Sequence, residues 1–222
     1  TEALDIFKGQ LEQNGDNMLM VTEPLRGHMA KVVDRFAKAM GGRYLAFDGM
    51  DNIAYRAAVK NVFQQDSLPD FDLANTNFML SFGADFLTTW VSPTRWSVGY
   101  GEFRHGEGRK RGTFYQVDPR FSTTAASADQ WVPVTPGWEG YLALSLAYVI
   151  ISEGLQAPNV DVAAMTDGRG VGALDAFRPE VAGARIGLPD HLRGETPTQF
   201  IEGLAREFAG NRPSLAIGGG SA

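Results

Sequence analysis

The sequence predicts an α/β fold in which a mostly parallel sheet carries helices on both faces. Short apolar runs such as NMLMV, NFMLSF and TFYQV have the length of buried strands. Segments with apolar residues at helical spacing follow most of these runs, and glycine, proline or acidic turns separate the two kinds of segment. Strands that alternate with helices are typical of parallel sheets, because parallel neighbours need a crossover connection.

The first part of the chain is expected to alternate helices with two strands. Leu4, Ile6 and Phe7 lie roughly on one side of the first helix. The Gly41-Gly42 pair ends the second helix, since glycine is common just beyond a helix C-terminus. The expected elements are a helix over 2–12, a strand over 17–21, a helix over 26–40, a strand over 43–47 and a helix over 51–63.

The rest of the chain is expected to add four strands and two long helices. Thr196, Pro197 and Gln199 have the pattern of a capping box with proline in the first helical position. Residues 154–195 are rich in Gly, Pro and Asp, which predicts an irregular segment with a short helix near 172–177. The other expected elements are strands over 77–82, 113–117, 131–134 and 215–217, a helical stretch near 94–103, and helices over 137–153 and 196–208.

These elements suggest a domain organisation. We expect residues 1–153 to form an α/β nucleotide-binding-like domain, 154–195 to be an irregular excursion, and 196–222 to complete or continue the same domain. The last apolar run leads into glycines, where an α/β protein normally continues with a helix. We therefore expect the chain to be part of a longer polypeptide.

Composition excludes several classes of protein and site. The net charge of −6 argues against a nucleic-acid partner, because such proteins usually carry a basic face. The absence of cysteine excludes disulfides, thiolate zinc sites and cysteine-ligated iron–sulfur clusters within these 222 residues. The three histidines are widely spaced and form no metal-ligand pattern. No apolar run reaches about 18 residues, so we expect no direct membrane insertion.

Candidate binding residues follow two of the predicted strands. Gly83 follows the strand over 77–82, where glycine lets a backbone approach a ligand closely, and Asp85 lies two residues further on. Asp118 and Arg120 follow the strand over 113–117, and a carboxylate at a strand end can accept both hydroxyls of a ribose. The alternatives are a simple tight turn at Gly83, and an Asp118 that caps local amides and pairs with Arg120.

Two more acidic residues are candidates. Asp129 ends the small-residue segment STTAASAD and can hydrogen-bond a base or a neighbouring backbone, or it simply ends a helical turn. Gly137 and Glu139 lie where the helix over 137–153 begins, and a carboxylate there can accept two N–H bonds from guanine or act as an ordinary helix cap. We find no serine with a plausible histidine partner in the sequence, so no candidate catalytic residue is assigned.

Three pieces of the sequence resemble the molybdopterin-dinucleotide oxidoreductase family, closely over 72–153 and loosely from about residue 17. They are FDLANTNFMLSFGADF, VDPRFSTTAASADQWVPVTPGWEGYLALSLAYVI and LAREFAGNRPSLAIGGGSA. The resemblance implies a Rossmann-like domain that helps to clamp a molybdopterin guanine dinucleotide. The matching positions are Gly83, Asp85, Asp118, Arg120, Asp129, Gly137 and Glu139.

The sequence departs from the family pattern at two places. The family usually has Trp-Gly-Ser-Asn-Pro where this chain has FGADF, so the anion Asp85 replaces an amide donor near the phosphates. The family's Pro-Gly-Thr-Asp turn is PGWE here, which puts the bulky Trp138 where a small residue would line the nucleotide. Both departures argue against a bound pterin.

The piece GADFLTTWVSP is similar to one branch of the family, the iron–sulfur and molybdopterin-like subunit of alternative complex III. That resemblance implies a structural domain of a membrane-associated quinol:electron-acceptor oxidoreductase, without a redox cofactor in this segment and not itself catalytic. Iron–sulfur clusters would lie elsewhere in the subunit. The partners would be iron–sulfur, haem c and quinol-binding membrane subunits, on the outer face of a bacterial cytoplasmic membrane.

Two alternatives remain open. In the first, the chain is the dinucleotide-clamping domain of a catalytic molybdenum bis-pterin reductase of the polysulfide, thiosulfate or tetrathionate type. In the second, it is a free-standing nucleotide-binding domain without redox partners. The sequence identifies neither the physiological donor nor the acceptor.

Overall fold

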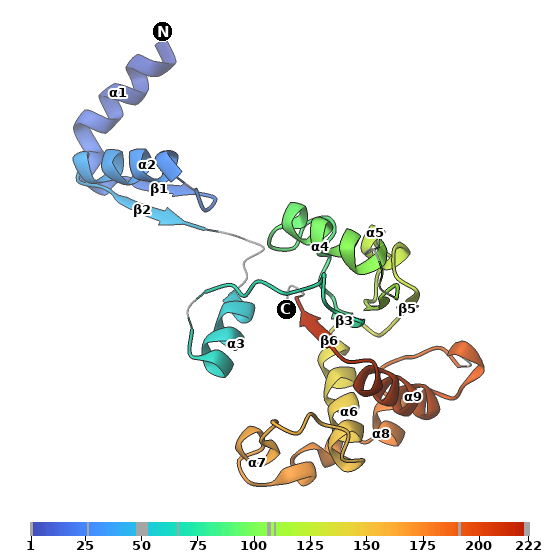
Figure 1. The fold of residues 1–222 in the computed structure, drawn as a ribbon. Coiled ribbons are helices and arrows are strands. Elements are labelled where there is room, and N and C mark those ends of the chain that lie inside the picture. The colour runs from blue at the N-terminus through green and yellow to red at the C-terminus, as the bar shows by residue number, and fades with distance from the viewer. Residues whose placement is uncertain are drawn as a thin grey trace. The chain divides into compact units, whose positions relative to one another are not determined.

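The computed structural model describes residues 2–25, 27–47, 53–65, 67–105, 108, 110–190 and 192–219 (Figure 1). The chain divides into two compact units, Thr1–Asp51 and Asn52–Ala222. The described strands form one parallel sheet in each unit, with two strands in the first and four in the second. The fold class predicted from the sequence, α/β with parallel strands flanked by helices, is confirmed.

The first unit is a β-α-β arrangement preceded by a helix. The two strands pair in parallel, with Leu19 opposite Arg43 and Thr22 opposite Ala46. One helix packs on this sheet and buries Val33 and Ala37. The elements are α1 (Glu2–Asn14), a 3₁₀ turn (Gly15–Asn17), β1 (Leu19–Thr22), α2 (Gly27–Ala39) and β2 (Arg43–Ala46).

Helix α1 forms as expected, but its predicted apolar side is exposed. Leu4, Ile6 and Phe7 are 64%, 61% and 55% exposed, and no residue of α1 is buried. Helical spacing specifies which side chains share a face and does not specify what covers that face. The predicted helix residues at 26 and at 51–52 lie outside the described part of the chain.

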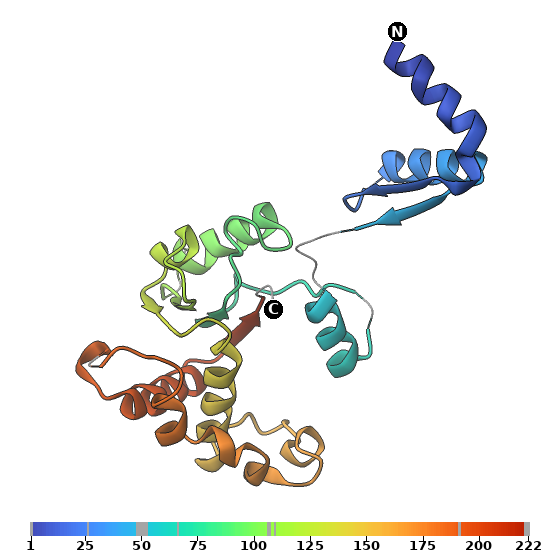
Figure 2. The same ribbon diagram turned by 180° about the vertical axis from the view of Figure 1, so that it is seen from behind.

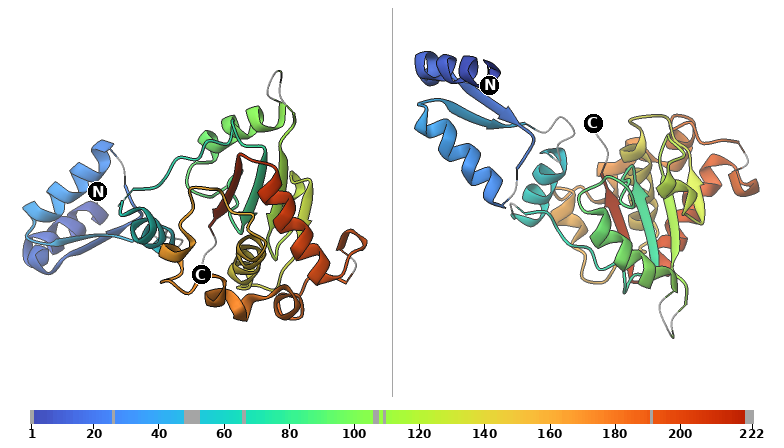
Figure 3. Two further views of the ribbon diagram at one scale, coloured as in Figure 1. Left: turned by 60° about the horizontal axis from the view of Figure 1, so that its bottom comes forward. Right: turned by 90° about the horizontal axis from the view of Figure 1, so that it is seen from above.

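The second unit is built on a sheet of four parallel strands in the order β5-β4-β3-β6 (Figure 3). The central strand β3 pairs in register with β4 on one side and β6 on the other, so that Phe82 lies between Val117 and Gly218. The strands are β3 (Phe78–Phe82), β4 (Thr113–Val117), β5 (Gln130–Val132) and β6 (Ser214–Gly218).

Helices cover both faces of this sheet, as Figures 1 and 2 show. Side chains alternate between the faces along β3: Phe78 and Leu80 pack in one core cluster, and Met79 packs in the other. The first cluster contains residues of α6 (Glu139–Ser152), α8 (Pro179–Gly183) and α9 (Pro197–Gly210). The second contains residues of α4 (Pro93–His105); α5 (Thr123–Ala126) begins just after β4, and α3 (Ile53–Phe63) precedes β3.

Residues 154–195, expected to be an irregular excursion, hold short helical elements that pack on α6. Tyr141 of α6 stacks edge-on against Phe177, with ring centroids 4.6 Å apart. The excursion contains α7 (Val162–Met165), a 3₁₀ helix (Gly170–Phe177), α8 and a 3₁₀ turn (Leu192–Gly194). Helix α9 then begins with the predicted capping box, in which Thr196 and Gln199 bond each other's backbone N–H.

The strand order determines where a ligand would be expected. The chain runs from β3 to β4 and β5 on one side, and then crosses back to β6 on the other side of β3. Ligands of open α/β sheets bind at such a switch point, outside the carboxyl ends of the strands. β1 and β2 form a sheet separate from this one, within the range 1–153 that we expected to form one domain. The boundaries at 153 and 195 stay predictions.

Candidate functional site

The loops after β3 and β4 begin side by side at the carboxyl edge of the larger sheet. Phe82 pairs with Val117, and the N–H of Gly83 donates to the carbonyl of Val117 at 2.8 Å. Gly83 has a φ of 67°, which glycine adopts without the steric cost that other residues bear. The structure therefore brings Gly83 and Asp118 to one edge of the sheet.

Asp85 joins the two loops. One oxygen of its carboxylate accepts a hydrogen bond from the hydroxyl of Thr124, and the other accepts from the Arg120 guanidinium at 3.1 Å. The Asp85 side chain is only 14% exposed, whereas Arg120 is 71% exposed. Asp85 thus ties the loop after β3 to α5 and to the loop after β4.

Asp118 is buried at the end of β4 and is also fully engaged. Its Oδ1 accepts from the backbone N–H of Arg120 at 2.8 Å, and its Oδ2 accepts from Nε2 of Gln116 at 3.2 Å. Its carbonyl accepts from the Trp131 indole at 2.8 Å. The alternative in which Asp118 caps a local amide therefore describes its geometry, but the Arg120 guanidinium pairs with Asp85 rather than with Asp118.

Sequence reasoning missed the buried side chains that complete this network. Gln116 and Thr124 are fully buried. The Oε1 atom of Gln116 has no hydrogen-bond partner among the described residues. A glutamine inside an otherwise apolar strand, TFYQV, was the available signal, because a buried amide requires partners.

Asp129 lies at the other end of β4. It accepts two bonds from Arg104 at 2.5 and 3.0 Å, one from Arg111 at 2.6 Å and one from the backbone N–H of Phe114 at 2.8 Å. Burial raises the pKa of Asp129, but the hydrogen bonds from Arg104, Phe114 and Arg111 outweigh it and lower the pKa to about 2. Phe114 is near the amino end of β4, roughly 13 Å along the strand from Asp118.

Asp129 therefore has a structural role in an ion pair with buried Arg104, and the structure does not bring Asp129 together with Asp118.

The two remaining candidates, Gly137 and Glu139, follow β5, which is the neighbour of β4 in the sheet. Gly137 has a φ of 83° and Glu139 is the first residue of α6. Among the described residues, no hydrogen bond or ion pair involves the half-buried Glu139 side chain. Trp138 precedes Glu139 and packs on Tyr141, with ring centroids 5.2 Å apart.

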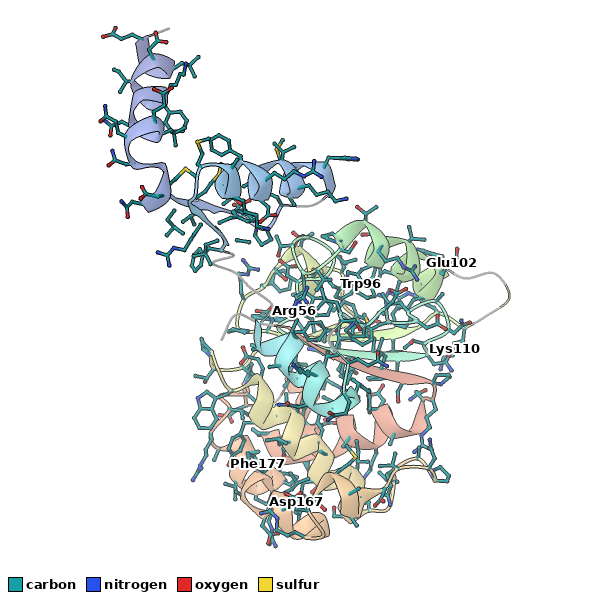
Figure 4. The ribbon with its side chains drawn as sticks, turned by 90° about the vertical axis from the view of Figure 1, so that its left-hand side faces the viewer. Arg56, Trp96, Glu102, Lys110, Asp167 and Phe177 are labelled. Atoms are coloured by element: carbon teal, nitrogen blue, oxygen red, sulfur yellow. The ribbon has the colours of Figure 1, made fainter. Side chains whose placement is uncertain are left out.

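The switch point between β3 and β6 is filled by an aromatic cluster of Tyr55, Phe71, Trp90 and Trp96. Trp90 contacts Tyr55 and Trp96 with ring centroids 5.2 and 5.9 Å apart, and Figure 4 labels Trp96 within this layer. A Cβ atom on Gly219 would lie 2.1 Å from Nε1 of Trp90, so the indole lies directly against the backbone after β6. Trp90 and Trp96 are buried, so these two side chains pack inside the second unit.

Three polar atoms in this aromatic cluster have no partner among the described residues: the Tyr55 hydroxyl and the indole N–H groups of Trp90 and Trp96. Burial raises the pKa of the Tyr55 hydroxyl to about 12, so it stays protonated at neutral pH.

The polar groups at this edge do not suit the diphosphate of a pterin dinucleotide. The N–H of Gly83 donates to the Val117 carbonyl, and the Arg120 guanidinium and the Thr124 hydroxyl donate to Asp85. Asp118 accepts from the Arg120 backbone N–H and from Gln116, so each of these groups already has a partner. Arg120 is the cation of this network, and it already pairs with an anion. Within the described ranges, no group of three or more acidic or histidine side chains is arranged to hold a metal ion, and no helix is long and apolar enough to cross a membrane.

Comparison with known proteins gives the following similarities. No family model matches the sequence. The chain is 25% identical over 177 residues to the menaquinone reductase molybdopterin-binding-like subunit of Nitratidesulfovibrio vulgaris, which covers 79% of this chain and 25% of that protein. It is 28% identical over 172 residues to the dimethyl sulfoxide reductase DmsA of Haemophilus influenzae, over 70% of this chain and 21% of that protein.

The fold is similar to that of acetylene hydratase from Pelobacter acetylenicus, with a TM-score of 0.63 at 20% identity. This alignment covers 97% of the chain and 29% of the hydratase. The chain therefore spans about a quarter of the length of the relatives it matches.

Proposed function

We propose that this chain, whose curated relatives are molybdopterin oxidoreductase subunits, is a structural domain of such a subunit and carries no redox cofactor of its own. We further propose that the full subunit belongs to a membrane-associated quinol:electron-acceptor oxidoreductase of the alternative complex III type. In that role the domain holds electron-transfer domains in place while the redox chemistry occurs elsewhere. Its lack of cysteine agrees with this division of labour.

One observation carries the proposal: the network around Asp85. An inherited nucleotide edge should present donors to phosphates, but here a carboxylate takes the Arg120 guanidinium and the Thr124 hydroxyl. Arg120 could bind a diphosphate only by leaving Asp85, and this would leave the nearly buried Asp85 carboxylate without its cation and facing the phosphates, which is costly. The relative named a molybdopterin-binding-like subunit agrees with this reading.

The proposal includes a setting for the whole subunit. The partners would be iron–sulfur, haem c and quinol-binding membrane subunits, and the complex would sit at the outer face of a bacterial cytoplasmic membrane. The name menaquinone reductase, borne by one relative, supports a partner that handles quinones.

A second candidate function is the clamping of a molybdopterin guanine dinucleotide in a catalytic reductase. Two observations favour it: the buried Oε1 of Gln116 lacks a donor among the described residues, and Glu139 begins α6 at the carboxyl edge. Other relatives are named molybdopterin-containing subunits. Asp118 and Glu139 would then hold the guanosine, and the cofactor would supply the redox chemistry.

Elemental analysis of the native subunit separates the two functions. We expect molybdenum and tungsten to be absent, and no guanine nucleotide to be released on acid denaturation. Stoichiometric metal together with guanine would refute the structural proposal. In that case Asp118→Ala should lower cofactor occupancy, and unchanged occupancy would leave Asp118 as a turn residue.

Tight binding of GDP to the isolated monomeric chain would instead favour a free-standing nucleotide-binding domain.

A further inference from the structure

An apolar groove lies on the face of the larger sheet that α6 and α9 cover. Its volume is about 400 Å³, which is within the range of small-molecule sites. The walls come from α6, the segment after it, α7 and the end of α9, and they include Leu144, Ile150, Val160, Met165 and Phe208. Leu144, Val160 and Met165 are 40%, 39% and 76% exposed, so the groove opens to solvent in this chain.

A smaller basic hollow lies at the amino edge of the same sheet. Its volume is about 190 Å³, and its lining includes three cationic residues, Lys110, Arg111 and Arg212. The first two precede β4, and Arg212 lies between α9 and β6. Arg111 pairs with Asp129 at 2.6 Å, whereas no carboxylate among the described residues pairs with Lys110 or Arg212. The hollow therefore carries positive charge in a chain whose net charge is −6.

Arg212 connects the two hollows. It belongs to the lining of both, and its guanidinium donates a hydrogen bond to the carbonyl of Leu155, which is part of the apolar groove. The groove is thus apolar along its walls and cationic at one end. An alkyl chain gains free energy by leaving water for such walls, and a guanidinium binds an anionic head group. This arrangement suits an amphipathic anion.

A buried polar atom beside Arg212 specifies the head group further. Gln156 follows Leu155 and lines the groove, and its Oε1 is buried with no hydrogen-bond partner among the described residues. A buried acceptor is costly unless a donor reaches it. A carboxylate offers no donor, but a hydroxyl group close to it does. Because Arg212 bonds the neighbouring Leu155 carbonyl, one head group can reach both side chains.

We infer that this groove is a binding site for a medium-chain alkyl carboxylate of the 3-hydroxy acid class. The alkyl chain lies between α6, α7 and the end of α9, Arg212 and Lys110 attract the carboxylate, and Gln156 accepts a hydrogen bond from the hydroxyl. The cationic end of the groove is at the amino edge of the sheet, whereas Gly83 and Asp118 are at the carboxyl edge. The inference therefore does not depend on whether the carboxyl edge binds a cofactor.

Isothermal titration calorimetry on the native subunit and on the 222-residue chain tests this inference. The probe is 3-hydroxydecanoate, kept below its micelle concentration. We expect saturable binding with a negative heat-capacity change, because the alkyl chain leaves water. Each CH₂ group added between 3-hydroxyhexanoate and 3-hydroxydecanoate should tighten binding about fourfold. Decanoate lacks the donor for Gln156 and should bind about fivefold more weakly than 3-hydroxydecanoate.

Four variants assign the binding to this groove. Ala147→Phe fills the groove from α6 and should abolish binding. Arg212→Gln should weaken binding about fivefold, because an ion pair at an exposed residue contributes little. Gln156→Leu should remove the preference for 3-hydroxydecanoate over decanoate. Arg43→Gln is the control: it removes the same charge from an exposed residue of β2 in the other unit and should leave binding unchanged.

Four outcomes would overturn the inference. They are the absence of saturable binding, an affinity that does not depend on chain length, wild-type affinity in a folded Ala147→Phe variant, and binding by the 222-residue chain that the native subunit lacks. The last would mean that another part of the polypeptide covers the groove. If Ala147→Phe does not fold, the chain-length series and the exposed Arg212→Gln variant still decide.

A membrane lipid is the other source of an alkyl chain with an anionic head group, and vesicles distinguish it from the free acid. Sedimentation with phosphatidylglycerol vesicles that is lost in Ala147→Phe, without binding of 3-hydroxydecanoate, would assign the groove to a lipid and overturn the inference. We expect binding of the free acid and no sedimentation with the vesicles.

Discussion

Asp85 is the residue whose surroundings most restrict what the carboxyl edge can bind. Its carboxylate has a buried partner in Thr124 and an exposed one in Arg120, and the two contribute differently to stability. An exposed ion pair adds little because water screens it, whereas a buried hydroxyl that loses its acceptor costs its full desolvation.

Asp85→Ala should therefore destabilise the second unit by about 1–3 kcal/mol, mostly through the stranded hydroxyl of Thr124. Asp85→Asn should cost clearly less, because the amide oxygen can still accept from that hydroxyl. Urea unfolding followed by fluorescence measures both variants. Equal losses for Ala and Asn would show that the ion pair with Arg120, and not the Thr124 bond, dominates.

The pKa of Asp129 predicts a specific acid sensitivity. Because the pKa is lowered from 3.8 to about 2 in the folded protein, the stabilisation is present above pH 3.8 and is lost as the pH falls towards 2. Asp129→Asn should flatten the pH dependence of stability in this window and leave its slope above pH 5 unchanged. A wild-type stability curve that is flat between pH 4 and 2 would contradict the assignment.

The residue-scale geometry could be predicted only in part. The turn glycine and the acidic strand ends were visible, because Gly83 and Asp118 directly follow apolar runs. The partner of Asp129 could not be predicted, since Arg104 is 25 residues away in sequence and pairing at that separation depends on the fold. The same applies to Asp85, whose partners Arg120 and Thr124 come from the loop and helix after the next strand.

Among the elements, β6 and its neighbours define the switch point, where Gly219 leaves room for the Trp90 indole. Gly219→Ala should destabilise the second unit by about 1–3 kcal/mol, because the new methyl group overlaps Nε1 of Trp90. Gly218→Ala is the matched control, since a Cβ there meets no atom within 4 Å. Denaturant unfolding of both variants compares them.

The coupling between these two positions supplies a stricter test. If the cost of Gly219→Ala comes from the indole, the same change in a Trp90→Leu background should cost much less. Additive losses in the double mutant would mean that Gly219 matters for its backbone conformation alone.

The positions of the long helices and strands agree closely with the sequence pattern. Which strands pair with each other could not be predicted from that pattern. The strand over 113–117 and the capping box of α9 were predicted because a short apolar run and cap chemistry are local signals. The short helix α8 was missed, since a single turn leaves no periodic signal. Helix α5 was anticipated only as the alternative in which a helical turn ends at Asp129. Strand patterns also do not specify pairing, so the separate sheet of β1 and β2 was not foreseen.

For the whole molecule, the second unit is a parallel α/β sheet whose carboxyl edge is bonded to itself. The chain should therefore show no rise in its unfolding midpoint when GDP is added. A nucleotide bound at a hundredfold excess over its Kd would add about 2.7 kcal/mol, which is readily measured. A shift of that size would mean that the Asp85 network opens at little cost.

The most direct test of the central claim is a high-resolution structure of the native subunit, purified without chelators. We expect the edge formed by Gly83, Asp85 and Asp118 to carry no pterin dinucleotide, with Arg120 and Thr124 still bonded to Asp85. Density for a guanosine on Asp118, with Arg120 turned away from Asp85 towards a diphosphate, would contradict it.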